Sequence, residues 1–153
     1  VRPLGLTTHA VHLVGWAADG RIWVQQRALT KSNDPGLWDT LMGGMVPASD
    51  TLQQALARET WEEAGLQLAQ LRDLRHGGRC SFRGPAQDGA GTGYVVEHID
   101  WFTCTVPDGV RPVNQDGEVA QFALLEPGEV LRRMQRDEFT LEAAVILASA
   151  PLW

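Results

Sequence analysis

The most constraining feature of the sequence is a helix whose two ends are both marked, over residues 51–64. Asp50 and Gln53 occupy the positions of an N-cap and its capping-box partner, and Gly65 supplies the residue that often ends a helix. The helix follows a loop rich in turn-forming residues, 29–44. Any fold for this chain must therefore accommodate a long loop that leads into one well-defined helix.

Three glutamates of this helix, Glu59, Glu62 and Glu63, follow i, i+3, i+4 spacing and so share one face. Like charges at this spacing cost roughly a few tenths of a kcal/mol per pair on an exposed helix. A hard divalent cation offsets that cost, because Mg²⁺ takes oxygen ligands. Taken alone, the triplet is more typical of a solvated face on which Arg58 pairs with Glu62 at i+4.

The segment just before the helix, MGGMVPAS, favours the metal-binding interpretation. Gly43 and Gly44 offer bare backbone that an ion or a phosphate can approach without meeting a side chain. A glycine loop, a helix and a carboxylate face together predict a platform for a cation.

The remaining apolar runs predict a mixed sheet sandwiched between helices, an α/β (α+β) domain. The dipeptide Asp19-Gly20 between the first two runs is typical of a tight hairpin. Residues 83–94 have the composition of an exposed, mobile loop. We expect strands near 8–17, 21–28, 38–42, within 66–82, over 94–107 and 117–127, and helices near 127–136 and 139–149.

Length and charge limit the function. A chain of 153 residues fits one domain, 1–153, and its 44% apolar residues include no run long enough to span a membrane. The net charge of −6 argues against nucleic acid as the main partner, since nucleic acids require clustered Lys and Arg. Neither Cys80 nor Cys104 has CxxC or CxxH spacing, and no secretion signal is visible, so we expect free, reduced cysteines in a cytoplasmic protein.

The glycine loop and the acidic helix resemble the Nudix box, the pattern G-x5-E-x7-R-E-U-x-E-E-x-G-U in which U is aliphatic. Two positions depart from the pattern: Asp50 replaces a glutamate that usually pairs with the box arginine, and Thr60 replaces an aliphatic residue. Thr60 has the shape of Val, so we expect its packing to be retained and its hydroxyl to need a partner. The matched positions are Gly44, Asp50 and Arg58-Glu59-Thr60-Trp61-Glu62-Glu63-Ala64-Gly65-Leu66.

The resemblance implies a Nudix hydrolase that cleaves a small-molecule diphosphate with catalytic Mg²⁺ or Mn²⁺. It implies Glu62 and Glu63 as metal ligands, Glu59 as a ligand or as the base that activates water, and the carbonyl of Gly44 or Gly43 as a further ligand. Arg58 supports the catalytic set through its pairing with residue 50. Arg27, Lys31 and Arg79 are candidates for phosphate contacts, although each is also typical of a surface cation.

Nudix enzymes often recruit one more carboxylate from outside the box. Asp116 and Glu118, in a glycine-containing loop, are the preferred candidates, with Glu97 and Asp100 as alternatives. Stacking on a planar ligand is a role for a tryptophan, and Trp38 in GLWDT is a candidate, although most of the six tryptophans are expected in the core or at an interface. Trp61 is expected to point away from the metal face. His9 and His98 are interpreted as ordinary strand side chains.

Further segments look like the Nudix domain associated with thiamine pyrophosphokinase, a branch linked to damaged thiamine diphosphates. That branch commonly carries an extra domain before the RPLG segment, so the chain is interpreted as a stand-alone relative or a fragment. GLWDT is also similar to isopentenyl-diphosphate isomerases, but these need a cysteine and a histidine where Met42 and Gly44 stand. A non-catalytic sensor module is the other alternative function. Many relatives are dimers, so a homodimer is also open for this chain. The segments that look like the thiamine pyrophosphokinase-associated domain are RPLGLTTHAVHLVGW, GRIWVQQRALTKSNDPGLWDTLMGGMV, QDGEVAQFALL and EFTLEAAVI.

Overall fold

The computed structural model describes residues 5–31, 33–85 and 94–150. A seven-stranded mixed sheet lies between helices, which confirms the predicted α/β class. The elements in chain order are β1 (Gly5–Ala17), β2 (Ile22–Arg27), β3 (Trp38–Asp39), β4 (Met42–Met45), α1 (Leu52–Ala64), a 3₁₀ turn (Leu68–Gln70), β5 (Arg72–Pro85), β6 (Tyr94–Val106), β7 (Val119–Leu125), α2 (Pro127–Gln135) and α3 (Leu141–Ser149).

Strand β1 organises the sheet because it exchanges partners along one edge. It pairs in parallel with β6 along its whole length, while its other edge pairs with β4 at residues 10–13 and with β2 at residues 15–16. The two partners must diverge where the exchange occurs. This divergence opens the sheet in front of the loop that leads into α1.

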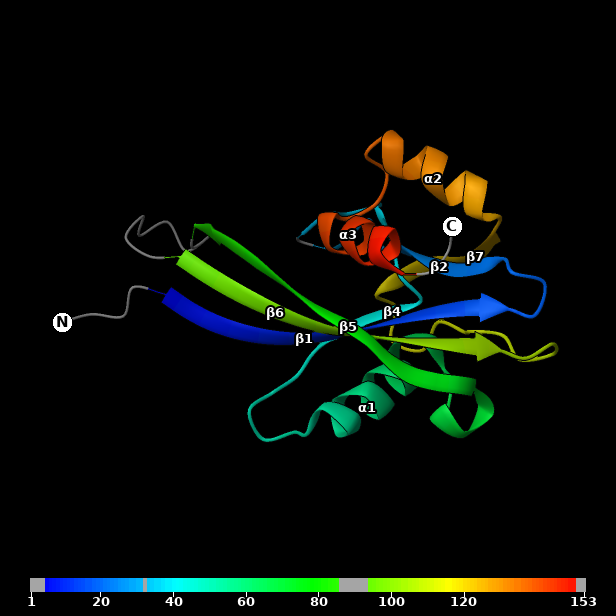
Figure 1. Cartoon of the computed structure of the whole chain (residues 1–153), viewed down its shortest axis with the longest axis horizontal. Helices are drawn as coiled ribbons and strands as arrows, with labels where there is room; N and C mark the ends of the chain where they lie inside the picture. The colour runs from blue at the N-terminus through cyan, green and yellow to red at the C-terminus, as the bar shows by residue number, and fades with distance from the viewer. Residues whose placement is uncertain (1–4, 32, 86–93, 151–153) are drawn as a thin grey trace.

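Side chains of β1 alternate between two apolar cores, as expected for a strand with both faces covered. Val14 belongs to the core under α2 and α3, whereas Val11 and Leu13 belong to the core over α1. Figure 1 shows α1 on one face of the sheet and α2 with α3 on the other, while β1, β6 and β5 extend together beyond the helices. The helices therefore hold the sheet at the end where the partner exchange lies.

Local differences from the sequence prediction have simple causes. The N-cap of α1 is Thr51 rather than Asp50, and its capping-box partner is Gln54. The single strand expected at 38–42 is divided into two short strands. The first, β3, pairs with β2, and the second, β4, pairs with β1. Most of the loop predicted at 83–94 lies outside the described residues. Both cysteines are free, as predicted, and the described residues include no helix that is long and apolar enough to cross a membrane.

Candidate active site

A cleft of about 470 Å³ opens where β1 exchanges β2 for β4. Strand β4 forms one wall through Gly43, Gly44 and Met45, and the end of α1 closes the floor through Glu59 and Glu63. Most of the polar lining is carboxylate. The lining residues are Ala10, His12, Arg27, Lys31, Asn33, Asp34, Asp39, Gly43, Gly44, Met45, Glu59, Glu63, Glu97, Glu118, Thr140 and Glu142.

Glu63 is the most deeply set box carboxylate, with 7% of its surface exposed. Its Oε1 accepts hydrogen bonds from Gln25 Nε2 at 2.6 Å and from the backbone N–H of Gly43 at 3.0 Å. Burial raises the pKa of Glu63 to about 8, although both hydrogen bonds act to lower it. No cation of the described residues pairs with this carboxylate, so its charge is left to be balanced by something from outside the chain.

Glu59 lies against the backbone of the glycine loop. A Cβ added at Gly44 would come within 2.5 Å of Glu59 Cγ, so only glycine fits there while Glu59 keeps its place. Burial, followed by the neighbouring charge of Glu62, raises the pKa of Glu59. Glu62 itself is exposed and does not line the cleft. The structure thus brings Glu59 and Glu63 together beside the Gly43-Gly44 loop, whereas Glu62 stays outside the cleft lining.

Arg58 pairs with Asp50, as the resemblance implied, despite the shorter side chain at position 50. Its second nitrogen, Nη2, lies 3.6 Å from Glu59 Oε2. The i+4 pairing with Glu62 is replaced by these two contacts. Arg58 therefore links the start of the box to a carboxylate of the cleft. Thr60 is fully buried, and its Oγ1 has no hydrogen-bond partner among the described residues, so the departure at this position leaves a hydroxyl unsatisfied.

Two of the predicted phosphate-binding cations line the cleft. Arg27 donates two hydrogen bonds to the carbonyl of Asn33, at 3.1 and 2.9 Å, and Lys31 Nζ lies 3.2 Å from Glu118 Oε2. Glu118 lines the cleft as well, whereas Asp116 does not. The Asp116 carboxylate instead accepts a hydrogen bond from the backbone N–H of Glu118 and shapes the turn. Of the two preferred acids outside the box, only Glu118 faces the cleft.

Trp38 and Arg79, predicted as ligand contacts, do not line the cleft. Trp38 is a core residue, because β3 turns its ring toward α2 and α3, with the guanidinium carbon of Arg133 4.9 Å from the ring centre. Arg79 lies on β5 and donates to Asp100, at 2.9 Å from Nη2 to Oδ2. Asp100 is therefore occupied away from the cleft, whereas Glu97, the other alternative acid, lines it.

Sequence reasoning missed several polar residues that shape the cleft. His12 is buried, bonds to the Thr40 hydroxyl at 2.8 Å, and its ring leaves no room for a Cβ at Gly43. Gln25 positions Glu63, and Asp39 and Glu142 add further carboxylates. The signal was present for His12, a polar residue between the apolar Val11 and Leu13, because buried polar groups need partners. Gln25 stands beside Gln26 and Arg27 in β2 and carries no such signal.

Similarity to known proteins agrees with this arrangement. The model of the NUDIX domain family matches residues 6–148, which span both the glycine loop and all strands that line the cleft. The chain belongs to the NUDIX domain family. Among solved structures, that of DR0079 from Deinococcus radiodurans superposes with a TM-score of 0.72 at 21% identity, covering 92% of this chain and 81% of that one. This likeness shows the shared fold.

Two relatives illustrate the range within the NUDIX family. Nudix hydrolase 24, chloroplastic, from Arabidopsis thaliana is 28% identical over 88% of this chain and 37% of its own length. An isopentenyl-diphosphate Delta-isomerase from Streptomyces coelicolor is 30% identical over 86% of this chain and 63% of its own length. The chain thus spans little more than a third of the first relative. Reaction and substrate must be argued from the cleft itself.

Proposed function

We propose that this chain is a metal-dependent hydrolase that cleaves a diphosphate linkage in a small molecule. The observation that carries the proposal is Glu63, a buried carboxylate with two neutral hydrogen-bond donors and no cation among the described residues. Glu59 beside it is confined by Gly44. An acidic cleft of this kind repels a diphosphate unless divalent cations mediate the contact.

The residues present fit a hard divalent cation such as Mg²⁺ or Mn²⁺. All candidate donors are oxygens, and the bare backbone at Gly44 keeps side chains away from the Glu59 carboxylate. In the described ranges, no three or more His, Cys, Asp or Glu side chains are gathered closely enough to hold an ion by themselves. Water and phosphate oxygens would complete the ligand set, as is usual for Mg²⁺.

The box residues then take distinct roles. Glu62 and Glu63 would hold the cation, with Gln25 and Gly43 fixing the orientation of Glu63 through its Oε1. Glu59, whose pKa is raised by burial, is suited to take the proton of the attacking water or to act as a further ligand. When bound, the cation would neutralise diphosphate charge and acidify the water that attacks phosphorus.

Cations at the rim would hold the substrate phosphates. Arg27 and Lys31 line the cleft, and Lys31 already contacts Glu118, so it can exchange that surface carboxylate for a phosphate oxygen. Glu118 would then be free to join the metal ligands. The Asp116 carboxylate accepts from the backbone N–H of Glu118 and Arg79 donates to Asp100 away from the cleft, so we assign neither residue a part in the reaction.

A second group of acids favours a substrate whose organic part is cationic, as in thiamine-type diphosphates. Burial raises the pKa of Glu142, and the charges of Asp39, Glu97 and Asp34 act on it in the same direction. These four residues line the cleft in addition to the box carboxylates. A positively charged ring would stabilise their ionised forms, whereas the neutral base of a nucleotide would not.

The two alternatives are less well supported. An isomerase related to those of the isoprenoid pathway needs a cysteine beside the reacting carbon, but neither Cys80 nor Cys104 lines the cleft, and Met42 is fully buried. A sensor module without turnover would have no use for the buried Glu63 or for the close contact between Glu59 and Gly44.

The test is a panel of diphosphates incubated with the chain and Mg²⁺ or Mn²⁺, with release of phosphate or monophosphate measured. The panel contains thiamine diphosphate, its oxo and oxy forms, nucleoside diphosphates and isopentenyl diphosphate. We expect metal-dependent hydrolysis that is fastest for the thiamine-type compounds. Hydrolysis of nucleotides alone would overturn the cationic-substrate assignment, and calorimetric binding without any product over hours would support the sensor module instead.

A further inference from the structure

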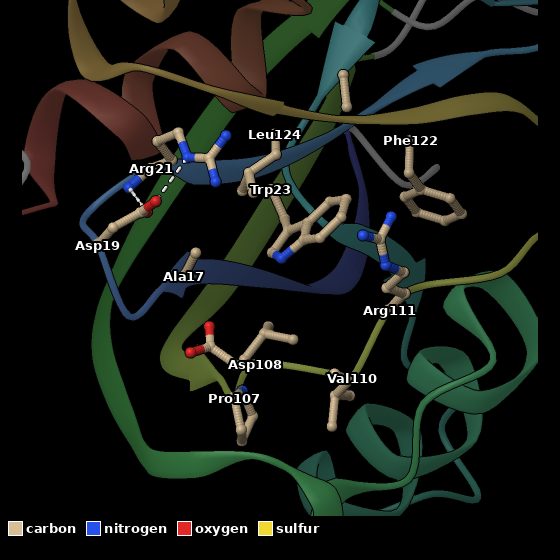
Figure 2. A pocket seen from close by; sticks show the side chains of 13 residues that line it. Ala17, Asp19, Arg21, Trp23, Pro107, Asp108, Val110, Arg111, Phe122 and Leu124 are labelled. Carbon is tan, nitrogen blue, oxygen red and sulfur yellow. Dashed lines mark hydrogen bonds and ion pairs between the residues drawn. The ribbon is translucent and has the colours of Figure 1, made fainter.

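A second pocket, of about 400 Å³, lies away from the acidic cleft and shares no lining residue with it. It is enclosed by the turn between β1 and β2, by β2 and β7, and by the segment from Val106 to Arg111 that leaves β6 (Figure 2). Its volume lies in the range of about 300–1,000 Å³ that is typical of small-molecule sites.

The wall of this pocket is aromatic. Trp23 on β2 and Phe122 on β7 both line it and are only partly buried, and Figure 2 shows the guanidinium of Arg111 between the indole and the phenyl ring in this view. Partly exposed aromatic faces that line one cavity are well suited to stacking on a planar ring. The wall therefore selects for planar ligands.

Three polar groups of the pocket lack a partner. In the described part of the chain, the indole N–H of Trp23, the carboxylate of Asp108 and the guanidinium of Arg111 make no hydrogen bond or ion pair within the protein. Arg111 and Asp108 reach the pocket from different sides of the indole (Figure 2). In contrast, Arg21 is satisfied by Asp19, at 2.8 Å from Nε to Oδ2.

We propose that this pocket binds a small planar aromatic molecule that carries one anionic group and one N–H donor. The ring stacks on Trp23 and Phe122, the anionic group pairs with Arg111, and the N–H group donates to Asp108. The charges of the four charged lining residues sum to zero, so the pocket suits a ligand of low net charge. Nucleoside monophosphates and aromatic amino acids both have this chemistry.

The experiment titrates the ¹⁵N-labelled chain in EDTA and follows the indole N–H resonances. The Trp23 signal is assigned as the one missing from Trp23→Phe. The probes are AMP, UMP, phenylalanine and 2-aminobenzoate, with adenosine as the ring without an anion and inorganic phosphate as the anion without a ring. We expect at least one class of probe that has both the ring and the anionic group to shift the Trp23 signal, with saturation at about 1 mM or below. Adenosine and inorganic phosphate, which each lack one of these groups, should bind at least about tenfold more weakly.

Substitutions of exposed residues in the segment from Val106 to Arg111 test the proposed ligand contacts without disturbing the core. Arg111→Gln should weaken binding by about tenfold and Asp108→Asn by less, whereas Arg72→Gln, on another exposed arginine, should leave it unchanged. Binding should persist in Glu63→Gln, which separates this pocket from the acidic cleft and from the proposed hydrolysis. The proposal is overturned if no complete probe shifts the Trp23 signal, or if Arg111→Gln binds like the parent.

Discussion

Glu63 and Asp100 are both almost fully buried, with 7% and 4% of their surfaces exposed, yet the pKa values of their carboxylates are shifted in opposite directions. Burial raises the pKa of Glu63 to about 8. Burial acts to raise the pKa of Asp100 too, but hydrogen bonds from Arg79, His76 and His9 outweigh it and bring that pKa to about 2.

The difference lies in what the chain provides as a counter-charge. Asp100 holds three basic side chains together across β1, β6 and β5, at 2.7 Å from each histidine nitrogen. Glu63 is given two neutral donors and faces more carboxylates, Asp39 and Glu59 among them. A buried carboxylate whose charge is balanced within the chain has a structural role, and one whose charge is left unbalanced is suited to bind a cation.

The largest expected effect is on turnover in Glu63→Gln. Glutamine keeps the volume and an oxygen that can accept from Gln25 and Gly43, and removes only the charge. We expect the rate of hydrolysis to fall by about a thousandfold with the melting temperature maintained. Glu126→Gln, on an exposed glutamate outside the cleft, is the matched control. A rate within a few-fold of the parent would make Glu63 structural, as Asp100 is.

Gly44→Ala tests whether the glycine loop positions Glu59. The new Cβ would lie 2.5 Å from Glu59 Cγ, so the carboxylate has to move from the cleft floor. We expect kcat to fall by about a hundredfold, because small displacements of a catalytic group are costly. Gly84→Ala is the control, since a Cβ there meets nothing within 4 Å. If both variants keep parental kcat, Glu59 is not held by the loop.

Asp100→Asn should cost stability and leave turnover intact. Removing the charge leaves Arg79 and two histidines without their anion, and we expect a loss of about 2–3 kcal/mol in unfolding free energy at pH 7. Because the folded-state pKa of Asp100 lies below its ordinary value of 3.8, its contribution is present above that pH and disappears as the pH falls to about 2. Denaturant unfolding of both proteins from pH 7 to pH 2 should therefore converge. A constant difference would contradict the pairing.

Cation binding should reverse the effect that Glu63 has on how the free energy of unfolding depends on pH. Its folded-state pKa lies above the ordinary 4.5, so without metal its contribution is favourable below pH 4.5 and is lost as the pH rises to about 8. Mn²⁺ binds the ionised form, and at roughly tenfold excess over its Kd it should add about 1–2 kcal/mol at pH 8 and less at pH 5. Thermal unfolding with Mn²⁺ or with EDTA measures this. Equal stabilisation at both pH values, or in Glu63→Gln, would place the ion elsewhere.

The sequence predicted the local features of the two carboxylate sites but not the contacts between distant segments. The helix of the box and the glycine loop follow from local spacing, the pairing of Arg58 with Asp50 was implied by the resemblance to the Nudix box, and each is present in the structure. The placement of Trp38 in the core and of Arg79 beside Asp100 depends on strand pairing between distant segments, which no local pattern specifies. For the same reason Glu142 could not be assigned to the cleft from its neighbours in sequence.

Thr60 extends the comparison to a buried polar group that has no partner at all among the described residues. Valine has the same shape and branching, so Thr60→Val removes the unsatisfied hydroxyl and keeps the packing of α1 against β4 and β1. We expect a gain of about 1 kcal/mol in unfolding free energy, seen as a higher urea midpoint with an unchanged m-value, and no change in turnover. Thr60→Ser keeps the hydroxyl, loses a buried methyl group and should destabilise by a similar amount. Destabilisation by Thr60→Val would mean that the hydroxyl is satisfied by bound water, and that burial without a protein partner does not by itself mark a cost in this helix.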